Sequence, residues 1–357
     1  MNQDGLIAEL FQKLHESPEL SMQETRTRAI IVDFLRSHTD FSVYDCGNFL
    51  YACHLEGESL ENIAFRADMD AIRDSHGKPF HGCGHDGHVC TLCRLALEIS
   101  NKKAGKNIYL FFQPAEETGQ GALLMLPLLR EKNITRIYGF HNIPGKTAGK
   151  VLLKSRTFAC ASRGLKLIFK GRQCHAAYPE TGVNPALAIA KVIMRINDVQ
   201  HNDYGAPVLA TIVNVQLGEP NAFGVSAGYG ELSCTVRSET DAAMERLQEY
   251  ITGFAEKICE ESGISLEIQT FDEFPSTVNS ETETERAEHI FRACGVDFEV
   301  LKTPMRWSED FGYYLKNTSG LFMGIGAGED VPPLHTDGYG YNTEIIEQSA
   351  KMLMLLI

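Results

Sequence analysis

Residues 62–70 read Asn-Ile-Ala-Phe-Arg-Ala-Asp-Met-Asp, a short apolar run that ends in two carboxylates. Outward from this stretch, short apolar runs alternate with helical patterns, with strands expected at 62–66, 107–112 and 136–140 and helices at 89–99 and 121–129. Such alternation is typical of strands buried on both faces of a largely parallel sheet. The sequence therefore predicts an α/β domain.

Two helices are predicted before this sheet. Leu6, Leu10 and Leu14 lie on one face of the first helix, and Asp4 is a plausible cap for it. Ser21 and Glu24 have the spacing of a capping box and announce the second helix. Strands are then expected at 41–44 and 50–54.

The pattern changes near Ala161, where a second domain is predicted. Its expected elements are strands at 164–169, 208–217, 231–237 and 265–270, with helices from Asn184-Pro185 onward and at 241–259. This order is that of a β-α-β-β-α-β unit. The chain then returns to the first domain with a strand at 321–325 and a helix at 343–355. We therefore place an inserted domain at 160–271, between residues 1–159 and 272–357 of the first domain.

Composition excludes several classes of protein. The 357 residues include 33 basic and 47 acidic side chains, which gives a net charge of -14. Such a surface repels nucleic acid and anionic lipid, so we expect neither as a partner. No run of about 18 apolar residues and no export signal is present, which favours a cytoplasmic protein. Its ten cysteines are expected to be reduced thiols, some of them available to a metal.

Polar, metal-competent residues follow the apolar runs. Asp68 and Asp70 follow the first run, Glu116 and Glu117 the second, and His141 the third. The carboxyl ends of strands in open α/β sheets are where ligands bind, so these side chains are predicted to share one rim.

Between them, residues 81–88 read His-Gly-Cys-Gly-His-Asp-Gly-His. The glycines allow Cys83 and His85 to turn toward one ion, and His335 could add an imidazole from a proline-rich loop. Thiolate, imidazole and carboxylate together suit zinc, manganese or cobalt, with zinc favoured by the thiolate. Five candidate ligands of these kinds are enough to hold two metal ions if one ligand bridges both ions.

Neighbouring polar residues in these stretches allow more than one role. His81 and His88 are spare ligand candidates, and Cys90 and Cys93 fit packing in a helix better than redox chemistry. The adjacent glutamates at 116–117 form an ordinary acidic turn if both face solvent. On a metal rim, one could ligate while the other takes a proton from bound water, whose pKa a cation lowers from about 15.7 toward about 7.

These residues resemble a known family, the co-catalytic metallopeptidases of the aminoacylase and carboxypeptidase G type. The similarity is to its amidohydrolase branch, which includes hippurate hydrolase, indoleacetyl-amino-acid hydrolase and N-acetyldiaminopimelate deacetylase. The matching stretches span nearly the whole chain: Phe65-Arg-Ala-Asp-Met-Asp-Ala-Ile72, Gly82-Cys-Gly-His-Asp-Gly-His88, Gln113-Pro-Ala-Glu-Glu117, Gly139-Phe-His-Asn-Ile-Pro-Gly145, Cys174-His-Ala-Ala-Tyr-Pro179, Ser308-Glu-Asp-Phe311 and Pro333-Leu-His-Thr336.

The resemblance implies roles for eight residues. It implies two divalent ions per subunit (zinc, manganese, cobalt or nickel), held by Cys83, His85, Glu117, His141 and His335. Glu116 would be the general base and later the proton donor to the leaving amine. Asp70 would orient a ligand imidazole. His175 would reach the active site of a partner subunit and stabilise the tetrahedral oxyanion.

The same resemblance implies a metal-dependent exopeptidase-like domain with a ferredoxin-like α+β domain inserted for dimerisation and as a lid. Homodimers would form through this insertion, with hinges near 156–161 and 271–277.

Two segments depart from the family pattern. The loop at 71–82 is short, with Arg73 where proline is usual, and residues 218–227 lack the usual Gly-Gly and Asn-Val-Ile-Pro pieces.

The resulting prediction is a metal-dependent amidohydrolase that cleaves N-acyl amino acids or similar small conjugates. One alternative is a dipeptidase or carboxypeptidase acting on short peptides. Another is a catalytically silent metal-binding scaffold, against which the intact Glu116 argues.

Overall fold

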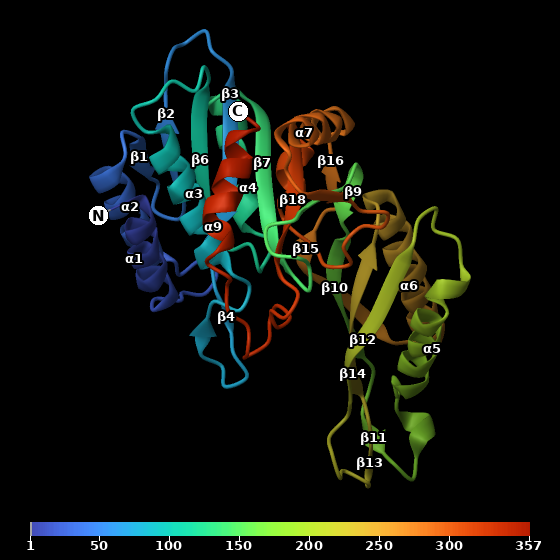
Figure 1. Cartoon of the computed structure of the whole chain (residues 1–357). Helices are drawn as coiled ribbons and strands as arrows, with labels where there is room; N and C mark the ends of the chain where they lie inside the picture. The colour runs from blue at the N-terminus through green and yellow to red at the C-terminus, as the bar shows by residue number, and fades with distance from the viewer. Residues whose placement is uncertain (1) are drawn as a thin grey trace. The chain divides into compact units, whose positions relative to one another are not determined.

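The computed structural model describes residues 2–357, which form two compact units (Figure 1). The first unit comprises the chain up to Phe158 together with Thr277–Pro304 and Asp310–Ile357. The second comprises Ala159–Ser276 and Met305–Glu309. The segment Met305–Glu309 joins the second unit because the amide of Cys160 donates to the carbonyls of Met305 and Trp307, at 3.1 Å each.

An eight-stranded sheet forms the centre of the first unit. Its spatial order is β1 (Ser42–Asp45), β2 (Leu50–His54), β6 (Asn107–Gln113), β3 (Asn62–Asp68), β7 (Ile134–Pro144), β18 (Ser319–Gly328), β8 (Val151–Leu153) and β17 (Phe298–Val300). The central strands β6, β3, β7 and β18 are mutually parallel. The predicted α/β class with a mostly parallel sheet is therefore confirmed.

Helices bury the apolar residues of this sheet. α3 (His85–Ile99) packs against α1 (Gln3–His15), α2 (Thr25–His38), α9 (Ile345–Met354) and β3. Ile63 and Phe65 of β3 join Leu92 and Leu95 of α3 in one buried cluster. Since side chains alternate along a strand, Arg66 points to the other face of the sheet.

The remaining elements of the first unit connect or flank the sheet. α4 (Gly121–Glu131) contacts β6, β7 and α8 (Gly312–Leu315), while α7 (Glu281–Cys294) packs on β18. Two short strand pairs complete the unit: β4 (Ile72–Arg73) with β5 (Pro79–Phe80), and β9 (Arg156–Ala159) with β16 (Thr277–Asn279).

The sequence predictions of the N-terminal caps were wrong. Asn2, not Asp4, caps α1, because the Asn2 side chain accepts from the amide of Gly5. Glu24 occupies the N-cap position of α2 but its side chain makes no capping hydrogen bond. Ser21 and Glu24 instead contact residues near the carboxyl ends of the strands, as described below.

Three other details refine the sequence predictions. α3 begins at His85 rather than Val89, so His85 and His88 lie in its first turn. His141 lies within β7 and does not follow it, because this strand continues to Pro144. Cys90 and Cys93 are fully buried free thiols in the core of α3, as expected for packing residues.

The second unit has the predicted β-α-β-β-α-β order. Its elements are β10 (Ala161–Lys170), α5 (Ala186–Asn197), β12 (Val208–Leu217), β14 (Tyr229–Ser238), α6 (Asp241–Ser262) and β15 (Ser265–Phe274). The strands pair antiparallel in the order β12-β14-β10-β15. Its short elements are β11 (Cys174–His175), which pairs with β13 (Val225–Ser226), and the 3-10 turns η1 (Pro179–Thr181) and η2 (Val199–His201).

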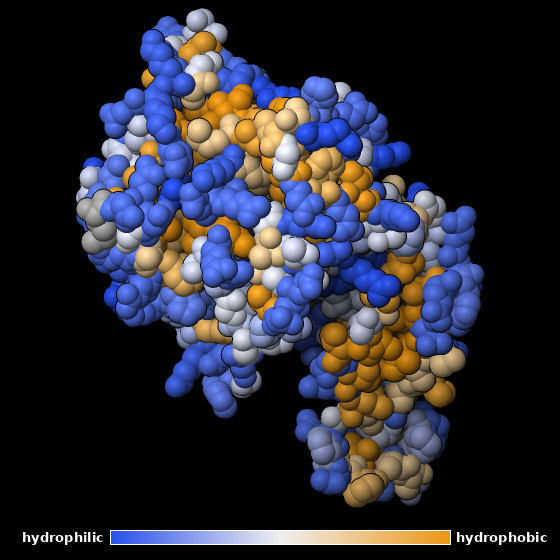
Figure 2. All heavy atoms as spheres, viewed as in Figure 1, coloured by the Kyte–Doolittle hydropathy of each residue, from blue (hydrophilic) through white to orange (hydrophobic). Residues whose placement is uncertain are grey.

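The edge strand β12 of this unit exposes apolar side chains. Figure 2 shows hydrophobic atoms gathered over the region of β12 and β14. The exposed residues of β12 include Leu209, Val213, Val215 and Leu217. Within residues 2–357, no helix is long and apolar enough to cross a bilayer.

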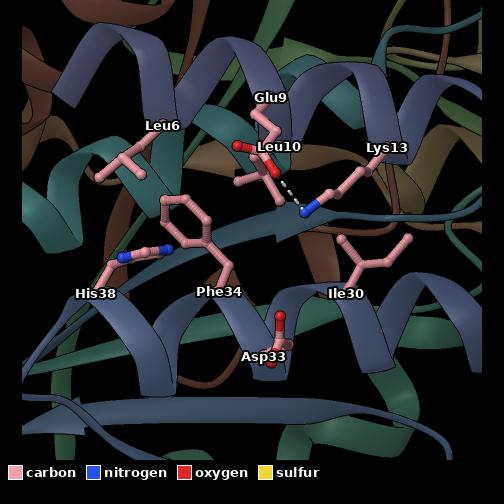
Figure 3. Close-up of a pocket in the computed structure, with 8 residues that line it drawn as sticks. All are labelled: Leu6, Glu9, Leu10, Lys13, Ile30, Asp33, Phe34 and His38. Atoms are coloured by element: carbon pink, nitrogen blue, oxygen red, sulfur yellow. Dashed lines mark ion pairs between the residues drawn. The ribbon is translucent and has the colours of Figure 1, made fainter. Parts of the chain in front are cut away.

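A small pocket lies between α1 and α2 in the first unit (Figure 3). Leu6 and Leu10 of α1 face Ile30 and Phe34 of α2 there, and the Glu9–Lys13 ion pair spans 2.7 Å at its margin. Its volume is about 70 Å³, and none of the predicted metal ligands lines it.

Candidate metal centre

The carboxyl ends of three adjacent parallel strands converge in the first unit. Asp68 is the last residue of β3 and pairs in register with Gln113, the last residue of β6. Asp70 follows β3, the glutamates at 116–117 follow β6, and His141 lies near the end of β7. The predicted shared rim is therefore present in the fold, and its members come from adjacent strands.

The glycines around Cys83 and His85 allow close backbone approach. Gly84 has a φ of +90°, and a Cβ there would lie 2.4 Å from the hydroxyl oxygen of Tyr339. A Cβ on Gly87 would lie 2.3 Å from the ring of Tyr341. Only glycine fits both positions, so α3 can begin directly beside the tyrosine-bearing segment.

The five predicted ligands lie close together. Cys83 Sγ is 3.3 Å from His141 Nε2 and 3.3 Å from His335 Nε2. Glu117 Oε1 is 3.3 Å from His335 Nε2 and 3.9 Å from His85 Nε2. Three overlapping groups have potential ligand atoms within 4.8 Å of one another: Cys83, His85 and His141; Cys83, Glu117 and His335; His85, Glu116 and Glu117.

The hydrogen bonds of two imidazoles direct their other nitrogens into this cluster. His85 Nδ1 donates to Asp70 Oδ1 at 3.1 Å, and His141 Nδ1 donates to the carbonyl of Asn142 at 2.8 Å. Among residues 2–357, His85 Nε2 and Glu117 Oε1 are buried and have no hydrogen-bond partner, although Glu117 Oε1 lies 3.3 Å from His335 Nε2. Buried polar atoms normally have partners, so this arrangement fits a cation held between them.

Buried carboxylates dominate the electrostatics of the cluster. Burial lowers the pKa of His85, but the carboxylates of Asp68, Asp70 and Glu117 outweigh it and raise the pKa to about 10. Burial and then the charges of Glu117 and Glu116 raise the pKa of the Cys83 thiol well above its usual value. Burial holds the pKa of His141 well below its usual range, which keeps its imidazole neutral. A cation would offset the excess of carboxylates and favour the Cys83 thiolate.

His335 is presented by a constrained loop. It adopts a φ of +62°, and its amide donates to the carbonyl of Gly82 at 2.8 Å. The loop is also attached to the β4–β5 hairpin, because the amide of Ser75 donates to Asp337 at 3.0 Å. The short loop at 71–82 thus contacts the segment that carries His335.

The two spare histidines make hydrogen bonds within the fold, and His88 also lies within 4.8 Å of potential ligand atoms of Asp68 and His85. His81 Nε2 donates to the carbonyl of Leu14 at 3.2 Å. His88 Nδ1 lies 2.6 Å from Asp68, and its Nε2 lies 2.7 Å from Asn142 Oδ1. Both ring nitrogens of His88 therefore have partners within the fold.

His175 lies in the second unit and is exposed on β11. The amide of Ala177 donates to its Nδ1 at 3.0 Å, which leaves the proton of a neutral imidazole on Nε2. Its Nε2 can therefore act as a hydrogen-bond donor.

Sequence reasoning missed several buried residues that support the centre. Arg66 contacts Asp68, Gln113 and Asp310, each at 2.8 Å. The sequence signal for this network was Arg66, a charged residue inside an apolar strand. The half-buried Ser21 donates to Asp70 and the buried Glu24 accepts from Ala115, and no local signal distinguishes such residues from helix caps.

The sequence matches the model of the peptidase family M20/M25/M40 over residues 64–357. It is 25% identical to an N-acetyldiaminopimelate deacetylase of Exiguobacterium sibiricum, with 92% of each chain covered. It is 27% identical to an N-acetylcysteine deacetylase of Bacillus subtilis, with 88% of this chain and 86% of the relative covered.

The fold is also similar to that of a solved structure. A dinuclear metal-binding M20 peptidase of Bacillus subtilis superposes with a TM-score of 0.83 at 22% identity, covering 99% of this chain and 97% of that one. The chain belongs to the peptidase M20/M25/M40 family. Within that family it is a metal-dependent amidohydrolase.

Proposed function

We propose that this amidohydrolase cleaves the amide bond of an N-acyl amino acid or a similar small conjugate, with Glu116 as the general base. The observation that carries the proposal is the position of Glu116. Its carboxylate is buried and lies within 4.8 Å of ligand atoms of His85 and Glu117, beside the five-residue cluster.

Cys83, His85, Glu117, His141 and His335 would hold two divalent cations, with zinc, manganese, cobalt and nickel all compatible with these donors. Ions bound there would supply Lewis acidity toward the acyl carbonyl and the attacking water. Asp70 holds the His85 ring through Nδ1, so its proposed role is to orient that ligand.

Glu116 performs the proton transfers in this proposal. Its carboxylate accepts a proton from the attacking water as the new carbon–oxygen bond forms. The same carboxyl group then delivers that proton to the amine nitrogen as the amide carbon–nitrogen bond breaks. A buried carboxylate beside the ligands is suited to both transfers.

The inserted domain, proposed at residues 160–271, would form a homodimer and carry His175 to a partner subunit's site. His175 Nε2 is oriented as a donor by the bond from Ala177, as required of a group that stabilises an oxyanion. The exposed apolar residues of the edge strand β12 support an interface on this domain.

The substrate class follows the deacetylase names of the relatives at 25–27% identity. The altered segment at 218–227 lies beside a cavity of about 390 Å³ in the second unit, lined by Leu217, Glu219, Val225 and Tyr229 among others. Specificity within the acyl amino acids is therefore expected to differ from that of relatives with the usual segment.

Replacing Glu116 with Gln tests the general base. The E116Q protein should retain the metal content of the parent, because the five ligands are unchanged, while kcat falls by several orders of magnitude. Metal content is measured by elemental analysis after reconstitution with each of the four ions. Retained turnover in E116Q would remove the assigned role.

A substrate panel tests the reaction class. N-acetyl and N-benzoyl amino acids are assayed beside dipeptides with free amino termini, using the metal-loaded parent. Preference for the acylated compounds supports the proposal, and preference for free peptides would replace it with dipeptidase or carboxypeptidase action. No hydrolysis of any amide by metal-loaded protein would indicate a silent scaffold.

A further inference from the structure

The segment between α1 and α2 contacts the metal centre from outside the ligand set. Leu20 forms a β-bridge with Ala71, whose amide donates to the carbonyl of Glu19 at 2.8 Å. Ser21 Oγ donates to Asp70 Oδ2 at 2.7 Å. The amide of Ala115 donates to Glu24 Oε1 at 2.8 Å. The segment 19–24 therefore touches both loops that carry the acidic residues of the site.

Ala115 has an unusual backbone conformation. Its φ is +49°, in the left-handed region, and the residue is fully buried. This conformation is strained for a residue with a Cβ, so surrounding contacts must maintain it. Glu116 and Glu117 follow directly, and their directions depend on this dihedral angle.

Hydrogen bonds hold Ala115 on both sides. Its carbonyl accepts from the amides of Gln120 and Gly121 at 3.2 and 3.1 Å. On the amide side, the carboxylate of Glu24 is the acceptor. Rotation about the φ angle of Ala115 would break the hydrogen bonds on one of these two sides.

Glu24 is not needed to cap its own helix. The first turn of α2 is capped by Glu19, whose carboxylate accepts from the amides of Arg26 and Thr27 at 3.1 and 2.8 Å. Glu24 is instead only 3% exposed, and burial followed by the charge of Asp70 raises its pKa to about 7. Burying a carboxyl group here costs stability, which indicates a role other than helix capping.

We propose that Glu24 is a positioning residue for hydrolysis: through Ala115 it holds the turn that aims Glu116 at the attacking water and Glu117 at the metal. This inference rests on the proposed function of Glu116. Glu24 itself contacts neither the substrate nor the predicted metal ligands.

The test compares four variants of the full-length, metal-loaded protein. E24A should lower kcat by about 10–100-fold, the scale expected when a catalytic group is displaced by about 1 Å, while KM changes less. E24Q retains an oxygen acceptor and should stay within a few-fold of the parent. Glycine adopts a positive φ without strain, so A115G added to E24A should recover a large part of the lost kcat.

E19A is the matched control, because it removes the helix cap of α2 without touching Ala115. It should lower the melting temperature at least as much as E24A does, with kcat changed less than three-fold. If E19A and E24A lose kcat equally, or if A115G gives no recovery in E24A, Glu24 has only a structural role and the proposal is overturned.

A second measurement does not depend on turnover. Hydrogen–deuterium exchange of a peptide covering residues 110–121 should be faster in E24A than in the parent and unchanged in E19A. Equal exchange in parent and E24A would overturn the positioning role even if hydrolysis is observed. If the exchange results are as expected but the parent hydrolyses no amide, the proposed function is refuted and the contact of Glu24 with the turn is not.

Discussion

The two ends of strands β3, β6 and β7 differ in how their charges are balanced. At the amino ends, Glu61 contacts Arg136 Nε at 2.7 Å and Lys106 Nζ at 2.6 Å, so one carboxylate faces two cations. At the carboxyl ends, four carboxylates gather around His85, and Arg66 pairs with Asp68 among them.

This difference separates a stabilising cluster from a reactive one. The amino-end charges are partly exposed and paired, and side-chain hydrogen bonding from Arg136 lowers the pKa of Glu61 to about 2. The carboxyl-end charges are buried, and two potential ligand atoms there have no hydrogen-bond partner among residues 2–357. A fold tolerates such an excess of buried carboxylates when it binds a cation.

The largest effect is expected at the thiol that contacts two histidines of the carboxyl end. C83A should lose most bound metal and lower kcat/KM by at least about 10³-fold, because both His141 and His335 lose a shared neighbour. Cys93 is a buried thiol within α3 and serves as the control. The C93A variant should lose about 1 kcal/mol of unfolding free energy but keep its metal. Elemental analysis and kinetics check both variants, and metal-replete C83A would contradict the ligand assignment.

The exposed histidine of the inserted unit should have a smaller effect. H175A is expected to lower kcat by about 10²–10³-fold, the usual consequence of removing one oxyanion donor, with metal content unchanged. Sedimentation measurements accompany the kinetics, because the role requires a dimer. Unchanged kcat in dimeric H175A would show that hydrolysis depends only on the carboxyl ends of the strands.

Removing the carboxylate behind His85 should weaken metal binding without abolishing it. D70A loses the acceptor of His85 Nδ1, and we expect a 10–100-fold lower metal affinity, measured by competition with a chelator. D33A, on the exposed face of α2, is the control and should bind like the parent. Equal affinities of D70A and D33A would argue against orientation of His85 by Asp70.

The smallest effect is expected at the amino ends. E61Q should lose about 1 kcal/mol of unfolding free energy at pH 7, a small value because the pair is partly exposed. The folded pKa of Glu61 is lowered to about 2, so its contribution is present above the unfolded pKa of about 4.5 and disappears as pH falls toward 2. Urea unfolding of metal-free parent and E61Q should therefore converge between pH 4.5 and 2. A difference that persists at pH 2 would contradict this account.

Much of the fold could be predicted because its signals are local. Apolar runs marked the strands, as with β2 and β6, and the β-α-β-β-α-β order of the second unit followed from spacing. Helix starts were less predictable: His85 opens α3 because Gly84 takes a positive φ, which the apolar periodicity does not report.

The candidate site was predictable where residues follow strands or glycines. The converging positions of Cys83, His85, Glu117, His141 and His335 agree with that expectation, although their roles as ligands stay predictions. Ser21 and Glu24 were misassigned because a capping box and a tertiary contact use the same residue types. Only the packing of residues 19–24 on Ala71 and Ala115 distinguishes the two.

The sequence by itself determined the order of strands and helices and the chemical types of the site residues, because periodicity and motif spacing are properties of neighbouring positions. The tertiary structure alone decided which side chains hold the imidazoles, which carboxylates crowd around His85 and which turn carries a left-handed alanine. Those outcomes depend on contacts between distant segments, such as that of His335 with Cys83, 252 residues away, and no local pattern encodes them.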